Sequence, residues 1–244
     1  MSKSTPRLWI HLVFPGFLLA ALAACGGGGG YGGGGGGGSM PQAQNLEAAP
    51  APKEPSDIPS TTLTVTSGGN SYTAIYSQTP NNGTTMFDGQ AAYSSTVSLT
   101  ITENGSTIGT EVSTAYYLES PYEPLGLSGT VSGTAYTFLF TSTNSYPSTL
   151  TVGSSGPLGS GTYYLSGTND AVGSLTETYS VTSNNSSNAL LLTTNGSGSV
   201  NGSSVNETIT YIVYSSGAVA LQSVQLTVNG TALTFGPPSG PWDY

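Results

Sequence analysis

The sequence predicts an all-β protein, folded as an antiparallel meander that closes into a barrel or a curved half-barrel. From Ser60 onward, Thr, Ser, Val, Leu and Tyr alternate with the period of two that half-buried strands show. Clusters of Gly and Asn separate these runs, and five Asn-Gly pairs mark tight turns between sequential neighbours. A two-sheet β-sandwich is the alternative arrangement of the same strands.

The clearest strand covers residues 96–102, where Val97, Leu99 and Ile101 share one face and hydroxyl residues share the other. Asn104-Gly105 follows, a preferred pair for a type I′ hairpin turn. A second alternating run then places Ile108, Val112 and Tyr116 on one parity. We therefore expect two paired strands around residue 104.

Similar units recur along the chain. A hairpin is expected over residues 63–76 and another over 224–235, and the apolar runs between them lie at 136–140, 150–152, 163–165, 175–181, 190–193 and 209–214. The Asn-Gly pairs, at 82, 104, 195, 201 and 229, are all interpreted as turns. In one place the period slips, since Val219 and Leu221 are odd-numbered and Val224 and Leu226 are even-numbered. A β-bulge near Gln222-Ser223 would keep both pairs on the core side.

We divide the chain into four parts. Residues 1–24 form a signal peptide, 25–59 a disordered tether, 60–236 a single all-β domain and 237–244 a proline-rich tail. The tether is predicted from its composition, because Gly-rich and Pro/Ala-rich stretches have too few apolar side chains for a packed core. An integral outer-membrane barrel would end on a closing strand, which the prolines of the tail disfavour.

The first 24 residues have the three parts of a secretory signal. Lys3 and Arg7 form a basic start, an apolar stretch covers residues 8–22, and small residues precede Cys25. Leu22-Ala23-Ala24-Cys25 resembles the lipobox of bacterial lipoproteins. That resemblance implies cleavage before Cys25 and acylation of its thiol, with palmitate-type chains as the membrane anchor. Gly26, in place of the Asp that retains such proteins at the inner membrane, implies the outer membrane of a bacterial cell envelope.

The charge distribution excludes most chemistries. Residues 54–244 hold no Lys, Arg or His but eleven carboxylates, so no salt bridge forms among their side chains. Nucleophile systems that need His, Lys or Cys cannot be built there, nor can His or Cys zinc sites. Nucleic-acid binding is excluded because no side chain neutralises phosphate. Each carboxylate is expected to be solvated, to accept hydrogen bonds from neutral donors or to bind a metal ion.

One aromatic and acidic segment is the candidate ligand-binding region. It lies over residues 116–124, interpreted as a proline-stiffened loop, and its candidate side chains are Tyr116, Tyr117, Glu119, Tyr122 and Glu123. Tyrosine rings stack on sugars and pack against protein partners, and two close carboxylates suit acid–base work on glycosidic bonds. Calcium is a further option for this segment and for Asn169-Asp170, but neither has a calcium-loop spacing, and we expect no metal site and no cofactor.

These observations predict a lipid-anchored domain of the cell envelope that is not an enzyme. It would act as a binding, adhesion or structural module, with the membrane as one partner through the lipid and a glycan or an envelope protein as another. Two alternatives stay open. The first is a carrier of an apolar ligand in a barrel or half-barrel cavity, and the second is a carboxylate-dependent glycosidase.

Overall fold

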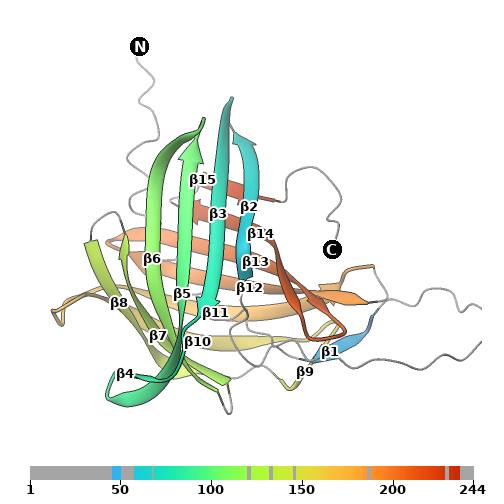
Figure 1. Ribbon diagram of the computed structural model, residues 1–244, viewed down its shortest axis with the longest axis horizontal. Coiled ribbons are helices and arrows are strands. Elements are labelled where there is room, and N and C mark those ends of the chain that lie inside the picture. The colour runs from blue at the N-terminus through green and yellow to red at the C-terminus, as the bar shows by residue number, and fades with distance from the viewer. Residues whose placement is uncertain are drawn as a thin grey trace, which may run out of the picture.

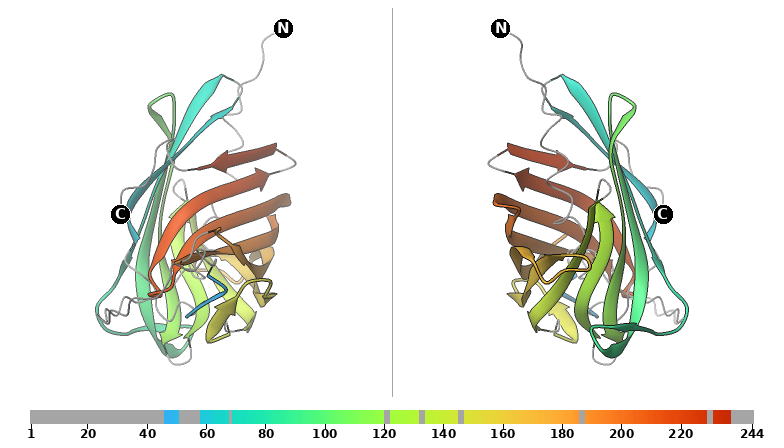
Figure 2. Two further views of the ribbon diagram at one scale, coloured as in Figure 1. Left: turned by 90° about the vertical axis from the view of Figure 1, so that its right-hand side faces the viewer. Right: turned by 90° about the vertical axis from the view of Figure 1, so that its left-hand side faces the viewer.

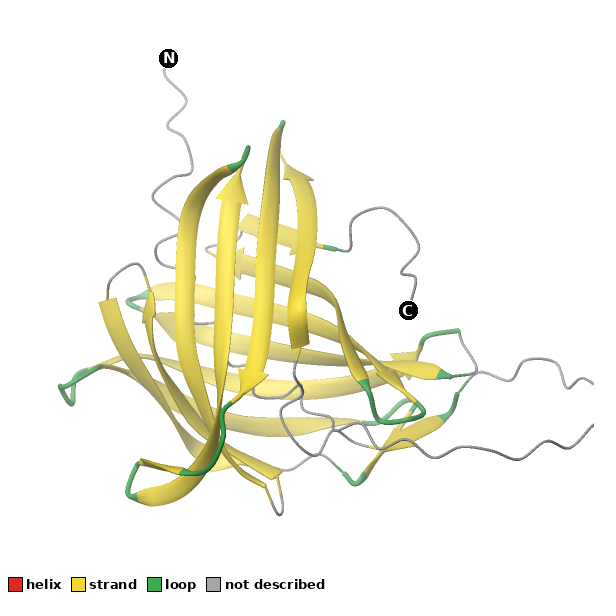
Figure 3. Ribbon diagram, viewed as in Figure 1, coloured by secondary structure: helices red, strands yellow, loops and turns green. Residues whose placement is uncertain are grey.

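The computed structural model describes residues 46–50, 58–67, 69–119, 122–131, 134–144, 147–185, 188–228 and 231–236. In these ranges the chain consists of strands and the turns between them (Figure 3). The all-β prediction is therefore confirmed. The described residues include no helix with the length and apolar character to span a membrane.

Fifteen strands are described. They are β1 (Ala48–Pro50), β2 (Ile58–Ser67), β3 (Asn70–Pro80), β4 (Thr85–Phe87), β5 (Gln90–Glu103), β6 (Ser106–Glu119), β7 (Tyr122–Val131), β8 (Thr134–Thr143), β9 (Thr149–Thr151), β10 (Ser155–Leu165), β11 (Ala171–Ser183), β12 (Ala189–Val200), β13 (Ser203–Tyr214), β14 (Val219–Val228) and β15 (Thr231–Phe235). Twelve of them form an antiparallel path from β15 down to β2 that skips β1, β4 and β9, with β4 attached to β5. Because most neighbours in the sheet are also neighbours in sequence, the meander prediction is confirmed.

The long sheet coils until its two ends nearly meet. Strands β2, β3, β5 and β6 form one layer, and β10 to β15 run crosswise behind it (Figures 1 and 2). Strands β7 and β8 join the layers on one side. On the other side, the described contact between β2 and the end of β15 is one antiparallel bridge between Thr64 and Gly236. The result is the barrel-like architecture that the sequence predicts.

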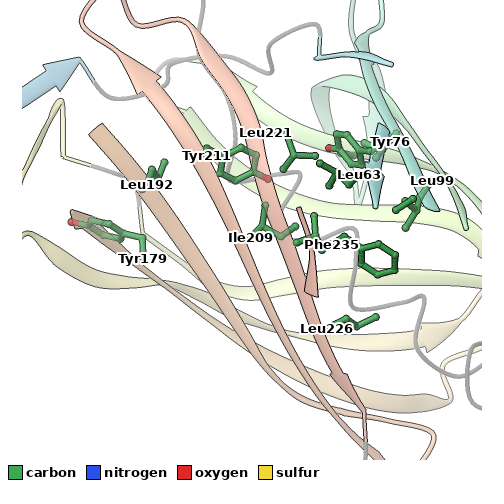
Figure 4. Close-up of a cluster of buried hydrophobic side chains, with 14 of the residues drawn as sticks. Leu63, Tyr76, Leu99, Tyr179, Leu192, Ile209, Tyr211, Leu221, Leu226 and Phe235 are labelled. Carbon is green, nitrogen blue, oxygen red and sulfur yellow. The ribbon is translucent and has the colours of Figure 1, made fainter. Parts of the chain in front are cut away.

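The core fills the space between the two layers. Side chains from both layers point into a common interior, among them Leu63 and Leu99 from one layer and Ile209 and Phe235 from the other (Figure 4). The period of two produces this arrangement, because alternate side chains of a strand point to opposite faces. Tyr163 and its neighbour Tyr164 illustrate it, the first fully buried and the second partly exposed.

The Asn-Gly turns are confirmed where both residues adopt left-handed backbone angles. Asn104 and Gly105 have φ of 49° and 82°, and the pair at 201–202 has 49° and 76°, as a type I′ turn requires. The pair at 195–196 is a correction, because both residues lie inside β12 and pair with β11 and β13. Tertiary pairing overrides the local turn preference there. The pair at 229–230 lies outside the described residues.

The predicted bulge is confirmed. Thr210 of β13 pairs with Ser223 of β14 and Tyr211 pairs with Leu221, so Gln222 is the extra residue. In β6 the buried face has the opposite parity to the run of Ile108, Val112 and Tyr116, since Ala115 and Tyr117 are buried while Val112 is 55% exposed. A second irregularity, between Ile101 and Thr102 of β5, changes the phase of the pairing with β6. Of the apolar residues singled out there, Ile108, the extra residue at this irregularity, packs against the core, whereas Val112 lies on the outer face.

Part of the expected tether is structured. Ala48, Ala49 and Pro50 of β1 pair with Thr151, Leu150 and Thr149 of β9, and Ala49 and Leu150 belong to the core cluster. Strand β2 begins at Ile58, two residues before the expected start of the domain. A short run of alanine beside proline carries no strand signal of its own. It forms a strand because it pairs with β9.

Candidate functional site

The turn between β4 and β5 is held against the sheet by an aromatic stack. The rings of Phe87 and Tyr116 lie 4.0 Å apart between centroids and 10° from parallel. Gly126 of β7 makes room for this stack, because a Cβ on it would lie 2.9 Å from the Phe87 ring. Asp88 and Gly89 then reverse the chain with φ of 46° and 78°, a type I′ geometry.

A hollow of about 170 Å³ lies beside this turn. We call it the bulge hollow, and its lining residues are Asp88, Gln90, Glu123, Pro124, Leu125, Phe140, Thr141, Ser142 and Thr143. Two of these are the extra residues of β-bulges, Leu125 in β7 and Thr141 in β8. Bulges occur often beside binding sites because they re-aim the neighbouring side chains. The hollow therefore exists where two strands lose their regular pairing.

Polar contacts order the walls of the bulge hollow. The Thr143 hydroxyl donates to a Glu123 carboxylate oxygen at 2.5 Å, and the Thr141 hydroxyl donates to the Ser160 backbone carbonyl at 3.1 Å. Phe140 packs edge-on against the buried Phe138 ring, with centroids 5.0 Å apart. The hollow thus presents hydrogen-bond acceptors, hydroxyl groups and one aromatic ring.

A second hollow, of about 490 Å³, lies along the other half of β8. It is lined by Thr137 and Leu139 of β8, by Tyr164 and Leu165 of β10, and by the turn residues Gly167, Thr168 and Asn169. Asn169-Asp170 was considered as an optional source of calcium ligands, although no metal site was expected there. Asn169 lies in a wall of uncharged side chains, so this hollow suits an uncharged ligand group.

The structure separates the sequence-predicted site residues. Glu123 lines the bulge hollow, and Tyr116 supports it through the stack on Phe87. Tyr117 is buried and packs against Tyr93, with ring centroids 6.1 Å apart, so it serves the packing of the barrel end. Glu119 and Tyr122 are paired in the register of β6 and β7. The segment is accordingly the end of a hairpin rather than a loop, and the lipidation candidate Cys25 lies outside the described residues.

Sequence reasoning missed several residues of the bulge hollow. Asp88-Gly89 is a hairpin signal of the same kind as Asn-Gly, and it was available in the sequence. Gln90, Phe140 and Thr143 carried no such signal, because they meet only through the pairing of β7 with β8 and the folding back of β4. Long-range register places them together.

The carboxylates fall into two classes. Glu103 accepts hydrogen bonds from the Asn70 amide at 2.8 Å and the Tyr72 hydroxyl at 2.9 Å. It is thus one of the carboxylates that accept hydrogen bonds from neutral donors, as the sequence predicts. Glu111, Glu177 and Glu207 are instead buried in the interior. Burial raises the pKa of Glu177 to about 8. Burial and the charge of Glu207 raise the pKa of Glu111, although the Ser113 hydroxyl opposes this.

The arrangement of the bulge hollow favours recognition by hydrogen bonds. In the described ranges, no three His, Cys, Asp or Glu side chains are grouped to hold a metal ion. Carboxylate and amide oxygens accept hydrogen bonds from hydroxyl groups, and threonine and serine both donate and accept them. A ring such as Phe140 adds an apolar face. The hollow is smaller than the roughly 300–1,000 Å³ of pockets that enclose drug-sized ligands, so it suits one unit of a larger ligand.

Comparisons with known proteins identify no relative of this chain. No family description, curated protein or solved structure matches it significantly.

Proposed function

We propose that this chain is a lipid-anchored, non-enzymatic binding module of a bacterial cell envelope, and that its β-domain holds a neutral glycan at the bulge hollow. One observation carries the glycan part. Asp88, Gln90, Glu123 and Thr143 bring hydrogen-bonding groups around the Phe140 ring, at a place where two bulges interrupt the sheet.

The charge of the domain selects among ligands. Residues 54–244 offer no cation, and the bulge hollow carries two carboxylates, so anionic polymers are repelled. A neutral sugar instead supplies hydroxyl donors for the carboxylates and an apolar ring face for Phe140. The small volume points to one sugar unit at the end or the side of a longer chain.

A glycan array probed with the purified mature protein tests the ligand class. We expect retention on neutral glycans, and we expect Glu123→Gln to weaken binding about tenfold, because removing a charged acceptor costs roughly 1.5 kcal/mol. Gln225→Ala is the matched control, since Gln225 is exposed on β14, far from the hollow in the sheet order. Binding that is lost equally in both variants, or is absent from every neutral glycan, contradicts the proposal.

A glycosidase is the second candidate, because the bulge hollow brings two carboxylates, Asp88 and Glu123, to one place. Glycoside hydrolysis needs two carboxyl groups roughly 5–9 Å apart across the scissile bond. Product analysis of each bound oligosaccharide separates the two functions. Recovery of intact oligosaccharide supports a binding module, and release of a reducing end that Asp88→Asn abolishes supports the enzyme.

The anchor is supported by Leu22-Ala23-Ala24-Cys25 after a basic and apolar leader. Two or three acyl chains hold a protein stably at a bilayer, since each buried methylene contributes about 0.8 kcal/mol. Growth with radioactive palmitate tests it. We expect label in the wild-type chain and none in Cys25→Ser, and label that persists in the variant would refute lipidation at this residue.

A further inference from the structure

Three glutamates point into the interior of the barrel. Glu111 of β6 is 1% exposed, Glu177 of β11 is 3% exposed and Glu207 of β13 is 1% exposed. Glu177 stands in phase with the buried Leu175 and Tyr179, and Glu207 stands in phase with Val205 and Ile209. These carboxyl groups occupy positions that the strand pattern reserves for apolar side chains.

The three carboxyl groups, called the interior trio below, come from both layers of the sheet. Glu177 and Glu207 both pair with Gly196 of β12, so they flank one glycine on the inner face. Glu111 comes from the opposite layer, and the charge of Glu207 acts on it. The charges of all three also raise the pKa of the buried Tyr163 hydroxyl, after the larger effect of burial itself.

Among the residues that the structure describes, no positive side chain balances the interior trio, because residues 46–50 and 54–244 contain no Lys, Arg or His. Hydrogen bonding is also incomplete. Glu111 Oε2 and Glu177 Oε1 have no partner, and the Ser113 hydroxyl lies 3.5 Å from Glu111 Oε1. The other titratable side chains in or against this core are Tyr72 and Tyr76 of β3, Tyr136 of β8, Tyr163 of β10, Tyr179 of β11 and Tyr211 of β13, and Glu103 of β5 accepts a hydrogen bond from Tyr72. None of these is a cation.

A buried carboxylate without a counter-ion carries a large desolvation cost, whereas a protonated carboxyl is neutral and can donate a hydrogen bond. We propose that the interior trio is a proton-binding site that holds the barrel closed, so that loss of its protons drives the two layers apart. The proposal is independent of the glycan site, because none of the three lines the bulge hollow.

The seam between β2 and β15 is where the layers separate. The two layers are joined through β7 and β8 by ladders of several residue pairs, such as the seven between β8 and β10. Across the seam, the described backbone bonds are Thr64 N–H to the Gly236 carbonyl at 2.9 Å and Gly236 N–H to the Thr64 carbonyl at 3.2 Å. Repulsion between Glu111 and Glu207 acts across the interior, and this joint has the fewest bonds to resist it.

Amide hydrogen exchange of the mature lipidated protein in detergent tests the proposal. Rates are measured at about pH 5 and about pH 8 and corrected for intrinsic exchange, and opening should become about tenfold more frequent per pH unit for each proton released. We expect β2 and β15 to lose protection at the higher pH, and β11 and β12 to keep theirs. Glu207→Gln and Glu111→Gln, which keep the shape and remove the charge, should each restore protection at the seam.

Asp170→Asn is the matched control, because Asp170 is an exposed carboxylate in the turn before β11. It should leave the wild-type pH response unchanged. Exchange at the seam that is independent of pH in the wild-type protein overturns the proposal, as does a response that neither interior variant alters. Protection at pH 8 that calcium chloride restores overturns it as well, since the site would then take a metal ion instead of a proton.

Discussion

Gly161 of β10 lies where the core leaves no room for a side chain. A Cβ on it would lie 2.2 Å from the Phe138 ring and 2.4 Å from the backbone oxygen of Leu139. Neither neighbour can retreat easily, because Phe138 is fully buried and Leu139 pairs across the sheet. At this position the absence of a side chain is a packing requirement.

We expect Gly161→Ala to destabilise the domain by about 1–3 kcal/mol, the usual cost of forcing extra volume into a packed core. Gly236→Ala is the control, because a Cβ there meets nothing within 4 Å. Urea unfolding followed by circular dichroism measures both. Equal midpoints for the two variants would contradict the packing described for β10.

Glu177 makes stability depend on pH in an unusual direction. Its pKa is raised from 4.5 to about 8. Below pH 4.5 the carboxyl group is therefore protonated in both the folded and the unfolded state, and it does not lower the free energy of unfolding. Between these values the unfolded state ionises while the folded state stays neutral, and the free energy of unfolding falls as the pH rises. The fall ends above pH 8.

A shift of this size corresponds to at most about 5 kcal/mol. We expect Glu177→Gln to be more stable than the wild-type protein at pH 8 and to show a weaker decline between pH 5 and pH 8. Asp170→Asn should retain the full decline. Urea midpoints across this range decide the matter, and a wild-type protein that is more stable at pH 8 than at pH 5 would refute the assignment.

The inward direction of two of these glutamates could have been predicted from the sequence. The odd-numbered positions around Glu177 and Glu207 are apolar, which already places both side chains on the inward face. Burial of carboxylates without cations is rare, so hydration was the expected fate. The interior location of Glu111 could not be predicted, because the irregularity in the pairing of β5 with β6 decides which face of β6 turns inward.

At the scale of elements, the bulge at Gln222 keeps two apolar pairs on the same side of β14. Leu221 and Val224 are both buried, although their spacing of three residues places them on opposite faces of a regular strand. The extra residue absorbs the mismatch.

Deletion of Gln222 should therefore turn one of the two pairs toward solvent. We expect a loss of several kcal/mol, since each large apolar side chain contributes about 1.5–3 kcal/mol when buried. Gln222→Ala is the control, because it keeps the residue count and removes a buried oxygen that has no hydrogen-bond partner. Thermal unfolding compares the two, and a deletion variant as stable as Gln222→Ala would contradict the role of the bulge.

Most strands could be predicted because their signals are local, including the run at 150–152 that overlaps β9, and the exceptions are β1, β4 and the start of β7, which was interpreted as a loop. Strands β1, β4 and β9 have three residues each and exist through pairing with a partner. Asn195-Gly196 shows the reverse case, a strong turn signal that two neighbouring strands override. Both kinds of error concern contacts that no short stretch of sequence encodes.

For the whole molecule, the position of the cations predicts how the domain can be released from a membrane. After the expected cleavage, the mature chain has one trypsin site, at Lys53, and every later residue lacks Lys and Arg. Lys53 lies between β1 and β2, so trypsin separates β1 from the main sheet without cutting that sheet.

We expect trypsin to release residues 54–244 from membrane vesicles as one fragment, while the palmitate label stays with the shorter N-terminal piece. The attachment of β1 to β9 rests on three residue pairs, too few to hold the pieces together. Mass spectrometry and centrifugation of the digested vesicles provide the measurement. A domain fragment that sediments with the vesicles after complete cleavage would show a second membrane contact.

The sequence by itself determined the strand class, the hairpin turns at 104–105 and 201–202, the bulge at Gln222 and the absence of cations after Lys53, because each of these is a property of neighbouring residues or of composition. Only the tertiary structure decided how the sheet closes, which carboxylates enter its interior and which side chains line the bulge hollow. These features depend on the register between strands far apart in the chain, and an irregularity of one residue in that register reverses the face that a strand presents.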